Sequence, residues 1–137
     1  MYIEYTEKLD LKTLNLLDNE FKTYADRNDT DSNYRFCNFI AKSQNEIMGI
    51  LKGHSNYDEV IVEDIIVAEK YRGIGVGTRL IKAVEEYCKD KGFKCVSLCT
   101  YEFQAPEFYR KCGFELEYKR ENKENPKLSK YFFVKYF

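Results

Sequence analysis

The chain has 137 residues, enough for one domain with a sizeable core, and its 22 Lys and Arg balance 23 Asp and Glu, which argues against a general nucleic-acid binder. No apolar run approaches the roughly 20 residues of a membrane-spanning helix, and the N-terminus lacks the basic and apolar parts of a signal peptide. The five cysteines form no C-x-x-C pair and the single histidine excludes a multi-histidine metal centre, so we expect a cytoplasmic protein with reduced thiols and no metal.

Hydrophobic periodicity divides the chain into alternating strand-like and helix-like segments. Turns are expected at residues 43–46 and 53–56, and His54 is interpreted as a turn residue. In chain order, we expect a strand at 1–5, a helix at 9–25, strands at 35–42, 47–52 and 58–67, a helix at 75–91, a strand at 93–100, a short helix within 104–113, and strands at 114–119 and 129–137.

The second and third helices have recognisable ends. Apolar residues recur at helical spacing after the third strand-like run and predict one buried face, formed by Val76, Leu80, Ile81, Val84 and Cys88. Gly92 is placed as the C-terminal cap of that helix. In the short helix, Pro106 suits the first position and Gly113 the residue after the last.

This order of elements predicts an α/β fold. The strand–helix–strand unit around residues 58–100 should be a parallel crossover, whereas the early hairpin and the closing strands should be antiparallel. We therefore expect one domain, residues 1–137, built on a mixed and mostly antiparallel central sheet of about six or seven strands with helices on both faces. The chain is expected to be a monomer or a homodimer, and the aromatic closing strand, with Tyr131, Phe132 and Phe133, is a candidate dimer edge.

A glycine-rich segment lies where the third strand-like run ends and the second helix begins. Gly73, Gly75 and Gly77 alternate there. Helix N-termini leave backbone N–H groups unpaired, and glycines let a ligand approach the main chain, so the segment suits a phosphate cradle. A tight turn that needs glycine for its conformation is the alternative. The P-loop motif is absent, and the dinucleotide motif G-x-G-x-x-G fails because Thr78 and Leu80 stand where its third glycine would be.

What remains is Arg72-x-x-Gly75-x-Gly77, and with it the chain resembles the GNAT superfamily, the GCN5-related N-acetyltransferases. Their signature, (Gln/Arg)-x-x-Gly-x-(Gly/Ala), likewise follows a strand and opens a helix. A second match lies about thirty residues later, where residues 105–114 resemble the family segment A-x-x-F-Y-x-K-x-G-F. The resemblance covers essentially the whole chain and is tightest over residues 60–114.

The resemblance implies acetyl-CoA as co-substrate and suggests which residues bind it. The glycine segment should hold the pyrophosphate, and the end of the preceding strand should splay so that its free main chain pairs with the pantetheine arm. Arg72 either contacts phosphate or is a solvated cation flanking the helix. Many relatives carry a cofactor-binding asparagine upstream of the short helix; the nearby positions here are Glu102 and Gln104, and Gln104 either serves as an amide donor to the cofactor or starts the helix. The expected cofactor-binding residues are Ile65, Ile66, Val67, Arg72, Gly73, Ile74, Gly75, Val76, Gly77, Thr78 and Gln104.

Two residues are candidates for the chemistry. The resemblance assigns Tyr109 as the proton donor to the leaving thiolate, because a phenol is protonated at neutral pH. Glu63 matches the proposed base of spermidine/spermine N-acetyltransferases; a carboxylate that only binds a cationic amine or forms a salt bridge is the alternative. Other family members carry the carboxylate two residues earlier, where this chain has Ile61. Adjacent strand residues face opposite sides, so Glu63 and Asp64 should separate, with one facing the cleft.

The sequence thus favours an N-acetyltransferase that passes an acetyl group to a primary amine of a small molecule or peptide by direct attack in a ternary complex. A non-catalytic acyl-CoA-binding or sensing module of the same fold is the second hypothesis. A dinucleotide-dependent oxidoreductase is weak because the fingerprint fails. Cys99 and Cys112 lie near the expected site and are interpreted as small apolar fillers.

Overall fold

The computed structural model describes residues 1–137, and its contacts divide the chain into two compact units, Met1–Ser32 and Asn33–Phe137. The first unit holds helix α1, Leu11–Arg27. Its N-terminus is capped by Asp10, whose side chain accepts a hydrogen bond from the Thr13 N–H at 2.7 Å. The predicted strand at residues 1–5 is wrong: no part of it joins the sheet, so its backbone has no neighbouring strand to pair with.

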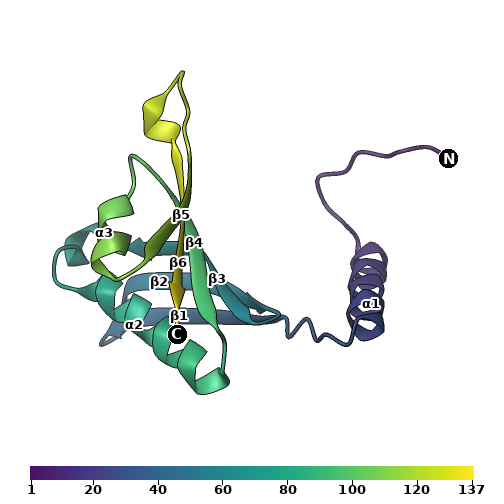
Figure 1. Ribbon diagram of the computed structural model, residues 1–137. Helices are drawn as coiled ribbons and strands as arrows, with labels where there is room; N and C mark the ends of the chain where they lie inside the picture. The colour runs from purple at the N-terminus through teal and green to yellow at the C-terminus, as the bar shows by residue number, and fades with distance from the viewer. The chain divides into compact units, whose positions relative to one another are not determined.

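The second unit is an α/β unit with one sheet (Figure 1). Its strands come from both sides of the glycine segment, and two short 3₁₀ helices lie in the connections. In chain order the elements are β1 (Arg35–Ser43), β2 (Glu46–Asn56), β3 (Glu59–Val67), η1 (Glu69–Tyr71), α2 (Val76–Lys91), β4 (Cys95–Tyr101), α3 (Pro106–Lys111), β5 (Glu115–Arg120), η2 (Pro126–Leu128) and β6 (Lys130–Tyr136).

The sheet is mixed and mostly antiparallel, as predicted. Its six strands lie in the order β1-β2-β3-β4-β6-β5. Only β3 and β4 are parallel, because helix α2 carries the chain back between them, and every other neighbouring pair is antiparallel. Since β6 is inserted between β4 and β5, it is not an edge strand. The prediction that the closing strand forms a dimer edge was therefore wrong.

The predicted turn at residues 53–56 is also wrong. Strand β2 continues through these residues to Asn56, and the chain turns at Tyr57 and Asp58 instead, with Tyr57 in a left-handed conformation at φ 55°. Gly53 and Ser55 are buried within β2 and pair with β1. His54 is therefore a strand residue, and its side chain lies on the face opposite to that of its buried neighbours.

Helices α2 and α3 pack on one face of the sheet. The five predicted apolar positions of α2 are all buried, and they join one core cluster with Tyr109 of α3 and with residues of β2, β3, β4 and β6. Pro106 and Gly113 bound α3 as predicted, with Gly113 at φ 86°. Within the second unit, α2 and α3 cover one face of the sheet. The expectation that helices cover both faces of the sheet stays a prediction.

Candidate active site

The parallel strands β3 and β4 separate after four residue pairs. Their pairing runs from Glu59 with Cys95 to Val62 with Leu98, although β3 continues to Val67 and β4 to Tyr101. A cleft of about 820 Å³ opens beyond this point, at the carboxyl ends of both strands. The predicted splayed strand end is thus confirmed, and the separation leaves one side of β3 without a strand partner.

Nearly all the expected cofactor-binding residues line this cleft. Ile74 is the exception: it is 67% exposed and does not line the cleft. Tyr109 and Glu63, the two candidates for chemistry, line it as well. The lining residues that were expected are Glu63, Ile65, Ile66, Val67, Arg72, Gly73, Gly75, Val76, Gly77, Thr78, Gln104 and Tyr109.

The main chain at the end of β3 presents alternate residues to the cleft. The Ala68 N–H donates to the Met48 carbonyl at 2.9 Å, and Ile66 pairs with Ile50 of β2. The alternation of an antiparallel ladder then turns the N–H and C=O groups of Ile66 toward β2 and those of Ile65 and Val67 toward the cleft. A pantetheine arm can therefore pair with Ile65 and Val67, whereas the backbone groups of Ile66 are directed to the sheet.

The glycine segment leaves the N-terminus of α2 uncapped by any side chain. Gly75 occupies the N-cap position in a left-handed conformation at φ 89°, and Gly73 has φ 77°. These φ values explain why both positions are glycine, because other residues adopt positive φ only with strain. Gly77 has a different reason: a Cβ there would lie 3.1 Å from Cζ of Phe108 in α3. The first N–H groups of α2 are thus available to an anion at the cleft.

Arg72 and Gln104 both have structural partners. The Arg72 Nε–H donates to the Val67 carbonyl at 3.0 Å and so ties the glycine segment to the end of β3. The Gln104 side-chain oxygen accepts from the Tyr101 N–H at 3.0 Å, while α3 begins only at Pro106. Both residues line the cleft, and each side chain keeps further N–H groups that these two contacts do not use.

Tyr109 projects from α3 into the core and reaches the cleft at its hydroxyl. The ring is 6% exposed and contacts Phe108, Phe114 and Phe133. The hydroxyl makes no hydrogen bond within the chain, yet no fully buried side-chain polar atom lacks a partner, so the hydroxyl is open to the cleft. Burial, with a smaller contribution from Cys112, raises the pKa of Tyr109 to about 12, which keeps the phenol protonated.

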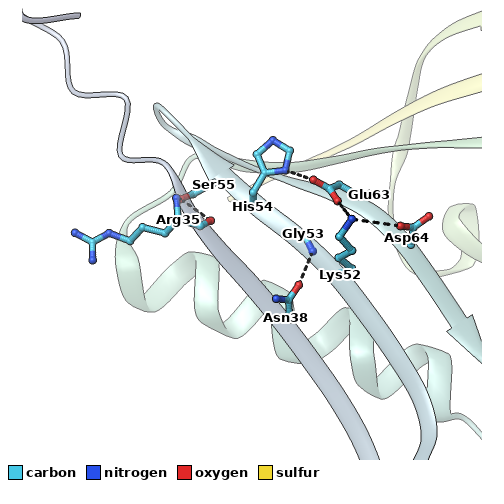
Figure 2. Close-up of polar contacts among 8 residues, drawn as sticks. All are labelled: Arg35, Asn38, Lys52, Gly53, His54, Ser55, Glu63 and Asp64. Atoms are coloured by element: carbon cyan, nitrogen blue, oxygen red, sulfur yellow. Dashed lines mark hydrogen bonds and ion pairs between the residues drawn. The ribbon is translucent and has the colours of Figure 1, made fainter. Parts of the chain in front are cut away.

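Glu63 and Asp64 do not separate to opposite faces, so that prediction was wrong. The register between β2 and β3 shifts here, because Lys52 pairs with Asp64 whereas Gly53 pairs with Val62. Glu63 is the extra residue of a β-bulge, which breaks the simple alternation of side chains. Figure 2 shows both carboxylates on the side of Lys52, whose Nζ lies 2.6 Å from Glu63 Oε2 and 4.0 Å from Asp64 Oδ2.

A glycine on the neighbouring strand permits this bulge. A Cβ at Gly53 would lie 2.7 Å from the Ile61 carbonyl oxygen, closer than real Cβ atoms approach. On the other side of the strand, the Gly53 N–H donates a hydrogen bond to the Asn38 side-chain oxygen of β1 at 3.3 Å (Figure 2). The bulge therefore depends on Gly53, and it places Glu63 at the point where β3 and β4 begin to separate.

The sequence did not identify Lys52 and His54 as neighbours of Glu63. His54 Nδ1 lies 2.6 Å from Glu63 Oε1, opposite the Lys52 contact. Residues two apart on one strand share a face, so a correctly placed turn at residues 57–58 would have paired both with the Glu63 region. The other residues missed are apolar or neutral lining residues of the cleft: Val62, Tyr71, Leu98, Thr100, Phe103, Ala105 and Phe108.

These contacts hold Glu63 as a carboxylate. The hydrogen bond from Lys52 and, after it, that from His54 lower the pKa of Glu63 below its ordinary value of 4.5, against the raising effect of burial. A group with a lowered folded-state pKa stabilises the fold above its unfolded pKa and loses that effect as the pH falls through the folded value. Chemical denaturation should therefore show Glu63→Gln less stable than the wild type at pH 7, with the difference shrinking as the pH falls below 4.5 and through the lowered folded-state pKa. A difference that grows on acidification would contradict this.

The two cysteines near the cleft are not primed as nucleophiles. Burial raises the pKa of the Cys99 and Cys112 thiols, so both stay protonated at neutral pH. No group of three or more His, Cys, Asp or Glu side chains is arranged to hold a metal ion. None of the helices combines the length and apolar character that crossing a bilayer requires.

A second hollow, of about 460 Å³, adjoins the cleft on the face of the sheet opposite to α2 and α3. Val62, Glu63, Leu98 and Cys99 line both spaces, so the cleft and the hollow meet where the strands separate. The carboxylates that line the hollow are Glu59, Glu63 and Glu117, and no Lys or Arg lines it.

Comparison with known proteins agrees with this geometry. A blasticidin-S acetyltransferase of Streptomyces morookaense is 31% identical over 83 residues, which cover 59% of this chain and 60% of that protein. An acetyltransferase structure from Bacillus cereus superposes with a TM-score of 0.78 at 25% identity, with 100% of each chain covered. A provisionally assigned streptothricin acetyltransferase of Bacillus anthracis, in complex with acetyl coenzyme A, has a TM-score of 0.67 at 28% identity over 80% of this chain and 67% of that one.

The chain spans 31% to 60% of the length of the curated relatives it matches. The sequence profile of the Acetyltransferase (GNAT) family matches residues 5–114, more than half of the chain. That match includes the glycine segment, the splayed strand β3 and Tyr109. The chain therefore belongs to the GNAT family of acetyltransferases.

Proposed function

We propose that the chain transfers an acetyl group from acetyl-CoA to a primary amine of a small molecule or peptide, by direct attack in a ternary complex. The observation that carries this proposal is the cleft between β3 and β4, which combines unpaired strand backbone, an uncapped helix N-terminus and a buried phenol. The family match from residue 5 to residue 114 includes α1 and supports treating residues 1–137 as one N-acetyltransferase domain.

The N-terminal N–H groups of α2 suit the pyrophosphate of acetyl-CoA, and the backbone of Ile65 and the N–H of Val67 suit the amides of its pantetheine arm. This arrangement directs the thioester to the region of Glu63 and Tyr109, which line the same cleft. The neutral amine nitrogen then forms a bond to the thioester carbon, the C–S bond breaks, and the Tyr109 hydroxyl gives its proton to the departing thiolate. The amine nitrogen loses one proton to solvent as the amide forms, and Tyr109 takes a proton back from solvent.

The acceptor is proposed to be cationic and to enter through the second hollow. That hollow is lined by Glu59, Glu63 and Glu117, it lacks basic residues, and it meets the cleft at Glu63. A carboxylate-lined space attracts an ammonium group and disfavours an anion. Antibiotic acetyltransferases among the relatives support a small-molecule acceptor for this chain.

A thiol-release assay tests the proposal. The protein is incubated with acetyl-CoA and a panel of amines that includes polyamines, aminoglycosides, blasticidin S, streptothricin, glucosamine 6-phosphate, amino acids and peptides. We expect thiol release well above the amine-free control with at least one cationic member, and the acetylated amine in the mass spectrum. Tight coenzyme A binding with no turnover across the panel would favour the non-catalytic binding module. Failure to bind coenzyme A would contradict both functions.

A further inference from the structure

The second hollow runs along the strands, away from the cleft. Glu59 pairs with Cys95 and Cys95 with Tyr136, so these three residues lie side by side across β3, β4 and β6 at its far end. Glu63, where the hollow meets the cleft, is four residues further along β3 than Glu59. A strand rises about 3.3 Å per residue, so the two ends of the hollow are at most about 13 Å apart.

The far end of the hollow carries two carboxylates without an ion-pair partner. Glu59 accepts a hydrogen bond from the Ser97 hydroxyl at 3.0 Å, and Glu117 accepts one from the Tyr136 hydroxyl at 3.4 Å. Neither forms a salt bridge, whereas Glu63 contacts an ammonium group at 2.6 Å. An ionised carboxylate has about four acceptor sites, so both keep sites for a cationic ligand.

Two cysteines of β4 lie in opposite charge environments within the hollow. Burial raises the pKa of the Cys95 thiol, and neighbouring carboxylates, Glu59 first, raise it further. Burial also raises the pKa of the Cys99 thiol, but there Lys130 and Arg120 act in the opposite direction. Cys95 lines only the hollow, whereas Cys99 lines both the hollow and the cleft. The far end therefore favours an ammonium group, and the nearby cations favour a neutral amine beside the cleft.

Between its two ends the hollow is lined mainly by apolar side chains. Ile61 of β3 and Val134 of β6 both lie beside Ser97 of β4, and Phe132 continues this surface toward the cleft. The Ser97 hydroxyl is already used by Glu59. The middle of the hollow therefore suits a hydrocarbon segment, because a polar group there would lose water without gaining a partner.

An independent feature indicates that a ligand occupies the space that the hollow joins. Tyr109 is 6% exposed, and its hydroxyl has no partner within the chain and is open to the cleft. A buried hydroxyl is costly without a partner, so a ligand is expected to supply one. The cleft and the hollow share Glu63 and Cys99, so a molecule in the hollow reaches the part of the cleft where the thioester is proposed to lie.

Resting on the proposed function, we propose that the acceptor is an elongated diamine whose two amino groups are joined by a hydrocarbon segment. One amino group reacts beside Glu63, and the other, as an ammonium group, is held by Glu59 and Glu117. The charge of Glu63 is already balanced by Lys52, so the reacting amine can be neutral while the far one stays charged. The two carboxylates at the far end repel an acceptor that carries a phosphate group there.

The first arm of the test compares acceptors by thiol release. The series runs from ethylenediamine to decamethylenediamine, and each diamine is matched by the amino alcohol in which a hydroxyl replaces one amine. The KM of the diamines should fall with length until the nitrogens span the hollow. At that length it should be about tenfold below the KM of the amino alcohol, because only the diamine forms charged hydrogen bonds at the far end. Added salt should reduce the difference.

The second arm removes the far carboxylates without changing their shape. In the double variant Glu59→Gln, Glu117→Gln, the KM values of the best diamine and its amino alcohol should converge. Calorimetric titration of that diamine into protein saturated with coenzyme A reads the same contact without turnover, and the double variant should bind about tenfold more weakly. Glu86→Gln, the same change at an exposed position of α2 that lines neither space, should match the wild type in both assays.

The outcomes separate this inference from the proposed function. Diamine binding that the double variant loses, without turnover of any amine, would overturn the proposed function and support the far subsite. Turnover in which no diamine has a lower KM than its amino alcohol would overturn the diamine inference alone. Equal diamine binding by the wild type and the double variant would overturn it as well. Neither turnover nor diamine binding would overturn both.

Discussion

Replacing Tyr109 with phenylalanine should remove most of the acetyl transfer while leaving coenzyme A binding and the fold intact. The ring contacts with Phe108, Phe114 and Phe133 survive, because only the hydroxyl is lost. That hydroxyl has no partner within the chain, so its removal leaves no buried group unsatisfied. Without a positioned proton donor the thiolate is a poor leaving group, and kcat should fall by about 10² to 10⁴.

Tyr131→Phe is the matched control for this variant. Tyr131 is also buried and also contacts the Phe133 ring, but its hydroxyl donates to Glu102 and does not line the cleft. Its loss should cost some stability and little activity. Steady-state kinetics, calorimetric coenzyme A titration and thermal unfolding distinguish the two. Activity of Tyr109→Phe within threefold of the wild type would mean that another group protonates the thiolate.

The pH profile offers a second check on Tyr109. A donor is active in its protonated form, and a pKa raised to about 12 keeps the phenol protonated throughout the usual assay range. Below about pH 10, deprotonation of Tyr109 should therefore not reduce the rate. Any alkaline decline of the wild-type rate in this range should also be present in Tyr109→Phe.

Local signals in the sequence were sufficient to find the donor side of the site. The strand–glycine–helix pattern located the cleft, since Gly75 and Gly73 require left-handed backbone and the apolar spacing from Val76 fixes the buried face of α2. Pro106 and Gly113 bounded α3 and so placed Tyr109. Each of these features depends on residues close together in the chain, which is why periodicity and turn chemistry sufficed.

The acceptor side depends on contacts between distant residues, and there the sequence reading failed. Gly53 looks like a turn residue in isolation, but it is a glycine because the Ile61 carbonyl of the next strand lies against it. That contact permits the bulge at Glu63, which overturns the simple alternation of β3 and brings Lys52 and His54 to the carboxylate. The insertion of β6 between β4 and β5 is likewise a long-range pairing that no local pattern encodes.

Gly75→Ala should weaken coenzyme A binding by about ten- to a hundredfold. A Cβ at Gly75 meets nothing within 4 Å in the protein, so the space beside the α2 N-terminus is open to a ligand. The methyl group should exclude a phosphate from the adjacent N–H groups, and each hydrogen bond to a charged group is worth about 1.5–3 kcal/mol. The strained backbone at φ 89° should also cost roughly 1 kcal/mol of stability.

Gly92→Ala separates the loss of coenzyme A binding from the loss of stability. It introduces the same backbone strain at a position that is away from the cleft. Gly92 caps the other end of α2 at φ 78°, it also has no atom within 4 Å of an added Cβ, and it does not line the cleft. Both variants should lose similar stability in denaturant unfolding, whereas calorimetry should show weaker coenzyme A binding for Gly75→Ala alone. Equal affinities would mean that Gly75 is needed only for the turn. A selective loss would assign the glycine segment to phosphate binding, since backbone strain is matched between the two ends of one helix.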